Sequence, residues 1–133
     1  MTTPPVPAAI LSAEPVPEDF AHHSPQHGAE LRFLGVVRGL EDGRPISGIR
    51  YSAYEAMALE KLGAIAAESA SLFPGTLVRV QHRTGFVAAG EASLLISAAS
   101  KHSAESFELC QWLLRRIKTE VPIWKEPVFT PTA

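Results

Sequence analysis

Seven basic residues stand near the ends of the helices and strands that the sequence predicts, and they are the side chains best suited to chemistry. They are Arg38, His82, Arg83, Lys101, His102, Lys118 and Lys125. Taken singly, each is more simply explained as a solvated surface charge, because Lys and Arg are mostly exposed in folded proteins. Taken together, they predict a pocket for an anionic small molecule.

His102 offers the clearest anion site within this set. It falls in the first turn of a predicted helix, where free backbone N–H groups favour a negative charge. Lys101, Ser100 and Ser103 are adjacent hydrogen-bond donors. A phosphate bound there, met by basic groups from other element ends, forms a coherent site.

The only cysteine, Cys110, lies on the apolar stripe of a predicted helix. A buried, inert thiol is therefore favoured over a sulfur carrier. One cysteine permits no internal disulfide, which favours a cytoplasmic protein. The sequence contains no GxSxG, P-loop, GxGxxG or CxxC motif, so the common nucleophile and nucleotide sites are not expected.

Three histidines, His22, His23 and His27, stand close together near the N-terminus. They lie on a segment broken by prolines, which gives them no preformed geometry, and no cysteine or clear carboxylate set joins them. We therefore expect no metal site here.

The elements that must position these residues follow from periodicity and turn chemistry. Residues 1–27 hold six of the eleven prolines and form a predicted N-terminal arm, partly disordered, with residues 1–14 loose and a short helix around Glu18 to His22. Residues 28–133 form one predicted domain of the α+β class, a mostly antiparallel sheet covered by two main helices. Expected strands are Ala29 to Arg38, Ile46 to Tyr54, Thr76 to Arg83, Phe86 to Ala88, Ala92 to Ala98 and an extended Val121 to Trp124.

The predicted helices and one predicted hairpin complete this outline. One helix carries Met57, Leu62, Ile65 and Leu72 and ends before Pro74-Gly75; the other carries Phe107, Cys110, Leu114 and Ile117. Turn residues from Glu41 to Pro45 suggest that the first two strands form a hairpin.

Composition narrows the class of protein. The chain has 133 residues, 46% of them hydrophobic, and a net charge of −2. These values fit one compact globular domain and argue against a nucleic-acid partner or an anionic membrane surface. No apolar run of membrane-spanning length is present, and the first basic residue is Arg32, so we expect neither a transmembrane helix nor a signal peptide.

Several ordered motifs resemble the catalytic subunits of molybdopterin synthases. The most specific is the closing stretch KTEVPIWKE, in which a lysine precedes VPIWK. The others, in chain order, are Gly28-Ala29, Phe33 to Arg38, YSAYEAMA from Tyr51 to Ala58, His82-Arg83-Thr84-Gly85 with Gly90-Glu91, and His102 to Phe107.

The resemblance implies an α/β hammerhead-type subunit that forms a homodimer within a heterotetramer and binds a small ubiquitin-like sulfur carrier ending in Gly-Gly. The carrier's C-terminal thiocarboxylate enters a pocket, and two sulfurs pass to cyclic pyranopterin monophosphate, giving the dithiolene of molybdopterin. It implies neither a cofactor nor a metal.

Carried over by matching positions, the resemblance makes Lys118 and Lys125 the catalytic lysines. Lysines in a basic pocket can act as acid, base or carbonyl-polarising groups. The implied substrate-binding residues are Val36, Val37, Arg38, Lys101, His102, Ser103, Glu126 and Pro127.

Three departures from the family pattern leave alternatives open. Ser103 stands where the family has an arginine, which removes a bidentate phosphate ligand; Ser52 replaces a carboxylate, and Glu126 replaces a second basic residue. An active sulfur transferase is the leading hypothesis. The alternatives are a degenerate paralogue that binds the carrier or a pterin phosphate without turnover, and an unrelated anion-binding module.

Overall fold

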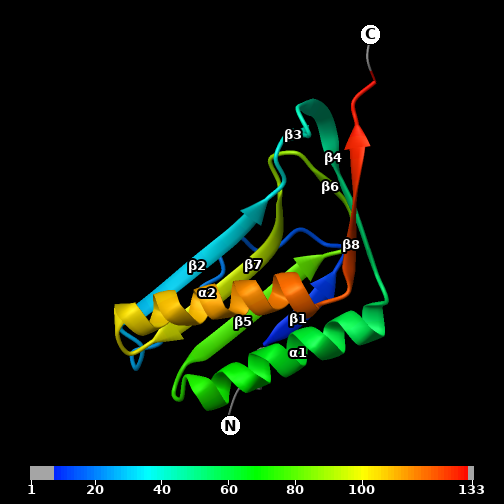
Figure 1. The fold of residues 1–133 in the computed structure, drawn as a ribbon. Helices are drawn as coiled ribbons and strands as arrows, with labels where there is room; N and C mark the ends of the chain where they lie inside the picture. Colours follow the sequence, from blue (N-terminus) through cyan, green and yellow to red (C-terminus); the bar gives the residue numbers. More distant parts are fainter. Residues whose placement is uncertain (1–7, 132–133) are drawn as a thin grey trace.

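A computed structural model describes residues 8–131, which form two sheets and two long helices (Figure 1). In chain order the elements are β1 (Ala9–Ser12), β2 (Ala29–Val36), β3 (Leu40–Glu41), β4 (Arg44–Ala53), α1 (Glu55–Leu72), β5 (Leu77–Arg83), β6 (Gly85–Ala88), β7 (Ala92–Ser100), α2 (Ser103–Glu120) and β8 (Ile123–Phe129).

The larger sheet has the strand order β1-β5-β7-β2. Its β5–β7 and β7–β2 pairs are antiparallel, whereas β1 pairs with β5 in parallel. Both helices pack side by side against one face of this sheet (Figure 1). The central strand β7 is buried along its whole length. The α+β class and the mostly antiparallel sheet are therefore confirmed.

The main core lies between this sheet and the helices. Leu62 and Ile65 of α1 meet Leu109 and Leu113 of α2 over Ile96 of β7, and all five side chains are at most 1% exposed. Spacings of three and four residues place such side chains on one helical face, which is why both helices were predictable. No helix among residues 8–131 is long and apolar enough to cross a membrane.

Each predicted apolar stripe contains both buried and exposed side chains. On α2, Cys110 and Ile117 are buried as expected, but Phe107 is 62% exposed. On α1, Met57 and Leu72 are both more than half exposed. The buried face of each helix runs through neighbouring positions instead, which are Ala58, Leu62, Ile65, Ala66 and Ser69 on α1 and Ser106, Leu109, Cys110, Leu113 and Ile117 on α2.

The smaller sheet overturns the expected hairpin. β2 pairs with β7 and not with β4. β4 instead lies between β6 and β8, and turns back on the two-residue strand β3. The turn residues Asp42 and Gly43 both have positive φ (51° and 75°), the geometry of a tight two-residue hairpin. The turn was therefore predicted correctly, but its upstream partner is β3.

The N-terminal expectation is wrong where the structure describes it. Ala9–Ser12 forms β1 and pairs with Val80–Arg83 of β5. This stretch, AILS, contains no proline, so its backbone can join the sheet. Residues 1–7 of the expected loose arm lie outside the described residues. The expected short helix is a turn, in which the backbone N–H of Phe20 donates to the carbonyl oxygen of Pro17.

Residues 13–28, here called the covering segment, lie across the other face of the larger sheet. Val16 and Phe20 pack on Leu95 and Leu34, whose side chains point away from the helices. β7 is thus covered on both faces, which explains its complete burial.

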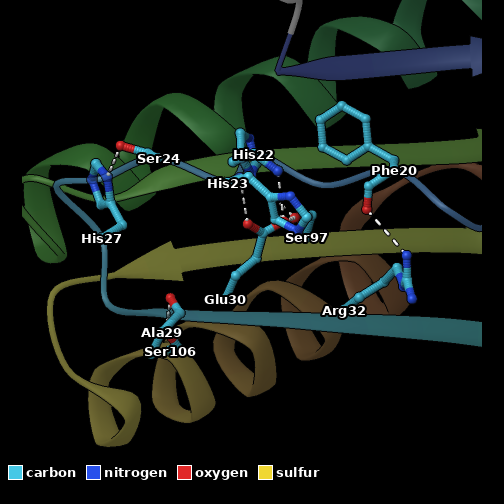
Figure 2. A network of polar contacts seen from close by, with 10 residues as sticks. All are labelled: Phe20, His22, His23, Ser24, His27, Ala29, Glu30, Arg32, Ser97 and Ser106. Atoms are coloured by element: carbon cyan, nitrogen blue, oxygen red, sulfur yellow. Dashed lines mark hydrogen bonds and ion pairs between the residues drawn. The ribbon is translucent and has the colours of Figure 1, made fainter.

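A carboxylate fastens the covering segment to the sheet. Figure 2 shows Glu30 of β2 accepting hydrogen bonds from the backbone N–H groups of His22 (2.7 Å) and His23 (2.9 Å) and from the Ser97 hydroxyl (3.2 Å). His27 is held separately, with Nδ1 at 2.9 Å from the Ser24 hydroxyl oxygen. In the described part of the chain no three side chains of metal-ligating type come together.

This fastening makes stability depend on pH. Burial raises the pKa of Glu30, but the backbone N–H groups of His22 and His23 outweigh it and hold that pKa below the ordinary 4.5. Burial lowers the pKa of His22 below 6.5. Both groups bind protons more readily in the unfolded chain, so acidification favours unfolding. We expect the free energy of unfolding to fall from pH 6.5 downward and again below pH 4.5, measured by urea denaturation across pH.

The substitution Glu30→Gln tests the lower part of this dependence. It removes the titrating carboxylate, so the loss of stability below pH 4.5 is expected to flatten. The exposed Glu60→Gln on α1 is the matched control and should keep the wild-type slope. An unchanged slope in Glu30→Gln would contradict this account.

Candidate active site

A cavity of about 720 Å³ opens where the two sheets meet the C-terminal end of α2. Its lining residues come from six strands, one helix and the segments after β2 and α2. Its lining residues are Phe33, Gly35, Val36, Val37, Arg38, Glu41, Ile49, Tyr51, His82, Ser93, Leu94, Leu114, Ile117, Lys118, Val121, Ile123, Lys125 and Pro127.

The last turn of α2 supplies Lys118. The buried Ile117 beside it anchors this turn on the core. The backbone N–H of Val121 closes the helix by donating to the carbonyl oxygen of Ile117 (3.2 Å). A cation in the last turn also complements the helix dipole. The packing of Ile117 and the end of the helix at Val121 therefore position the exposed Lys118 side chain at the cavity.

β8 supplies Lys125 through its pairing with β4. Lys125 and Tyr51 are direct cross-strand partners, so their side chains leave the same face of the smaller sheet. The Tyr51 side chain is buried, and its hydroxyl donates to the Ser93 hydroxyl at 3.2 Å. The strand register therefore places Lys125 beside the buried Tyr51.

The chain leaving β2 supplies Val36, Val37 and Arg38. A register shift between Gly35 and Val36 ends the regular pairing with β7. Val37 is then held by two backbone hydrogen bonds, donating to Glu91 (3.0 Å) and accepting from Gly90 (2.7 Å). This irregular exit from the sheet brings Arg38 to the cavity.

Strand alternation separates Glu126 from its neighbours. Lys125 and Pro127 both line the cavity, whereas Glu126 between them does not. Successive side chains of a strand point to opposite faces, and Glu126 is exposed on the other one. Of the predicted β8 residues, the structure therefore brings only Lys125 and Pro127 to the cavity.

Lys101, His102 and Ser103 lie at the opposite end of the molecule. They stand at the start of α2, whereas Lys118 stands in its last turn. A helix of 18 residues is about 27 Å long. None of the three lines the cavity.

His82 is one of the seven basic residues noted in the sequence, but it is not among the site residues that the family resemblance implies; it lines the cavity. It is only 8% exposed, and its ring stands edge-on to Tyr51 at 5.1 Å between centroids. Burial lowers the pKa of His82 below its ordinary 6.5, and the nearby Lys125 ammonium lowers it further. Its place within the motif HRTG was visible in the sequence, but its neighbours on β4 and β8 were not.

The charges around the cavity favour an anion. Arg38, Lys118 and Lys125 face it with positive charge, and Glu41 is the opposing carboxylate among the lining residues. Apolar side chains form much of the remaining wall. The arrangement suits a small molecule that combines an anionic group with a partly apolar body.

Comparison with known proteins decides the family. Residues 9–120 match the family model described as MoaE protein. The chain belongs to the MoaE protein family. Because the match begins at Ala9, the first strand of the structure is part of the MoaE domain.

Curated relatives of this MoaE chain are molybdopterin synthase catalytic subunits. The protein from Oryza sativa subsp. indica is 39% identical over 102 residues, covering 77% of this chain and 53% of that protein. The protein from Pyrococcus abyssi is 36% identical over 101 residues, covering 76% of this chain and 68% of that protein. The chain therefore spans about half the length of the rice relative.

Solved structures show the same MoaE fold. The crystal structure of molybdopterin synthase from Staphylococcus aureus aligns with a TM-score of 0.84 at 29% identity, covering 92% of this chain and 91% of that one. A complex of subunits 1 and 2 of molybdopterin-converting factor from Helicobacter pylori aligns with a TM-score of 0.65 at 26% identity, covering 79% and 73%. Family membership excludes the unrelated anion-binding module.

Proposed function

We propose that this chain is the catalytic subunit of a molybdopterin synthase. It transfers sulfur to cyclic pyranopterin monophosphate from the C-terminal thiocarboxylate of a small carrier subunit. The observation that carries the proposal is the convergence of Lys118, Lys125 and Arg38, from three separate elements, on one cavity. The names of its relatives support the proposal. We propose a cytoplasmic location, which the single buried Cys110 supports.

The cavity's charge fits both proposed reactants. The pterin carries a phosphate, and the carrier ends in a thiocarboxylate, so two anions must approach each other. Three cationic side chains lower the cost of that approach and stabilise oxyanions that form as the acyl group reacts. Sulfur arrives on the carrier, so Cys110, buried on the core side of α2, is not needed as a sulfur donor.

The proposed partner is a small carrier protein whose Gly-Gly end enters the cavity. The two-subunit complex from Helicobacter pylori supports a partner of this kind. Two glycines carry no side chain beyond hydrogen, so this chain end needs less room in the cavity than any other pair of residues.

The position of His102 calls for a second copy of this chain. Lys101, His102 and Ser103 stand about one helix length from Lys118 in the same protomer. They belong to the same substrate site only if a second protomer presents its helix start to the first protomer's cavity. We therefore propose a homodimer with composite sites, within a heterotetramer that includes two carriers.

Mixing two inactive variants tests the composite site. Lys118→Ala and His102→Ala copies are each expected to lose sulfur transfer. Mixed dimers made by co-expression contain one cavity with both defects and one with neither, so activity should return to about half of the wild type per mixed dimer. Absence of recovery in verified mixed dimers would contradict a composite site.

Ser103 keeps one alternative open, a decayed relative that binds the carrier or a pterin phosphate without turnover. A single-turnover comparison of wild type with Ser103→Arg decides between the two. The proposal expects product from the wild type. An inert wild type that gains activity in Ser103→Arg would favour the decayed relative.

A further inference from the structure

We infer that His82 is the proton acceptor of the cavity, a catalytic residue that receives a proton at Nε2 during sulfur transfer. The inference rests on the proposed function and adds to it the group that takes up a proton. The lysines and Arg38 are hydrogen-bond donors, so they bind anions but are poorly suited to accept a proton while charged.

One hydrogen bond fixes the tautomer of His82. Its Nδ1 lies 2.7 Å from the carbonyl oxygen of Arg83. A carbonyl oxygen only accepts, so Nδ1 carries the proton and donates it to this bond. In the neutral ring, Nε2 therefore carries a lone pair.

The lone pair of Nε2 faces the cavity. In the described residues Nε2 has no hydrogen-bond partner, yet it is not among the buried polar atoms that lack one. Nε2 is therefore accessible, although the residue as a whole is only 8% exposed. Since His82 lines the cavity, the cavity gives Nε2 this access.

The surroundings of His82 keep the ring neutral and in place. Burial and the Lys125 ammonium both lower its pKa, while the hydrogen bond to Arg83 opposes them. Tyr51 of β4 holds the ring edge-on. The charged and titratable groups that face the cavity around it are Arg38 after β2, Glu41 of β3, Tyr51 of β4, Lys118 of α2 and Lys125 of β8.

The proposed reaction needs an acceptor at one identifiable step. Once the thiocarboxylate sulfur is bonded to a substrate carbon, it is still bonded to the carrier's acyl carbon. Water adds to that acyl carbon and gives one proton to Nε2 of His82. The C–S bond then breaks with its electron pair on sulfur, which stays on the substrate as a thiolate. The carrier leaves as a carboxylate, and its second proton passes to solvent.

A matched pair of variants separates this role from a structural one. His82→Asn retains a side-chain N–H that can donate to the Arg83 carbonyl oxygen but has nothing at the position of Nε2. His82→Gln retains a hydrogen-bond acceptor near Nε2 but cannot take up a proton near neutral pH. Both variants are expected to lose about 10²–10⁴-fold in the single-turnover rate. Carrier binding and thermal unfolding temperature should stay close to wild type.

The wild-type enzyme supplies a second test that needs no variant. The single-turnover rate should fall on acidification with the same midpoint as the His82 imidazole, measured by ¹⁵N NMR of histidine-labelled protein in complex with the carrier. That midpoint is expected below 6.5, since the base must be unprotonated to act. In His82→Gln this acidic limb should be absent from the residual rate.

The outcomes distinguish this inference from the proposed function. An active wild type with a slow His82→Gln and a shared midpoint supports both. An active wild type with His82→Gln within threefold of it, or with a rate that does not change through the His82 midpoint, overturns the role of His82 alone. A wild type that forms no product with a competent carrier overturns the proposed function and the inference together.

Discussion

Replacing Lys118 by alanine is expected to lower single-turnover molybdopterin formation by at least about 10²-fold, the usual loss when one donor to a developing oxyanion is removed. Lys118 stands at the cavity on the last turn of α2, close to the apolar wall formed by Ile117. The backbone of Lys118 is held there by the last turn of the helix. Rapid-quench detection of the product, with a thiocarboxylated carrier in excess, measures the effect.

Arg115→Ala is the matched control for this variant. Arg115 is an exposed cation on the same helix, three residues away, and does not line the cavity. Its loss should change the rate less than about threefold, since surface substitutions away from a site have small effects. A Lys118→Ala rate no lower than that of Arg115→Ala would remove Lys118 from the catalytic set.

Replacing Leu113 by alanine is expected to produce the largest loss of stability, about 2–5 kcal/mol in the free energy of unfolding. Leu113 is fully buried in the main core between α2 and the larger sheet. Truncation there removes apolar contacts and leaves a space that the surrounding β7 and α1 side chains can fill only in part. Urea denaturation at neutral pH measures the change.

Phe107→Ala on the same helix is the control for Leu113→Ala. The Phe107 side chain is 62% exposed, so its removal from the isolated protomer should change the unfolding free energy by less than about 0.5 kcal/mol. Equal losses in the two variants would show that the buried face of α2 differs from the one described.

Both helices were predictable because their signal is local. Leu62 and Ile65, and Cys110 and Ile117, mark buried faces by spacing alone, and Pro74-Gly75 marks an end. Strand pairing was not predictable in the same way. The partner of β2 is β7, some sixty residues later, and no local pattern encodes that distance. β1 was not predicted either, because the prolines around it indicate a loose segment and its strand structure depends on pairing with the distant β5.

The candidate site was likewise predictable from the sequence only in part. Lys118, Lys125 and Arg38 were found through ordered motifs, and the cavity brings them together. The motif containing His102 gives no information on which end of α2 faces the cavity, so its distance from Lys118 emerged only with the fold. The neighbours of His82 could not be predicted from the sequence, because they depend on the cross-strand pairing of Tyr51 with Lys125.

The most direct test of the central claim follows the sulfur atom itself. A carrier bearing a ³⁴S-labelled thiocarboxylate is mixed with this protein and cyclic pyranopterin monophosphate, and the pterin product is analysed by mass spectrometry. Cys110→Ala serves as a parallel sample, because a buried core thiol should contribute no sulfur. The account predicts molybdopterin that carries ³⁴S in both samples. Unconverted pterin with a carrier that a related synthase can use, or product without the label, would contradict it.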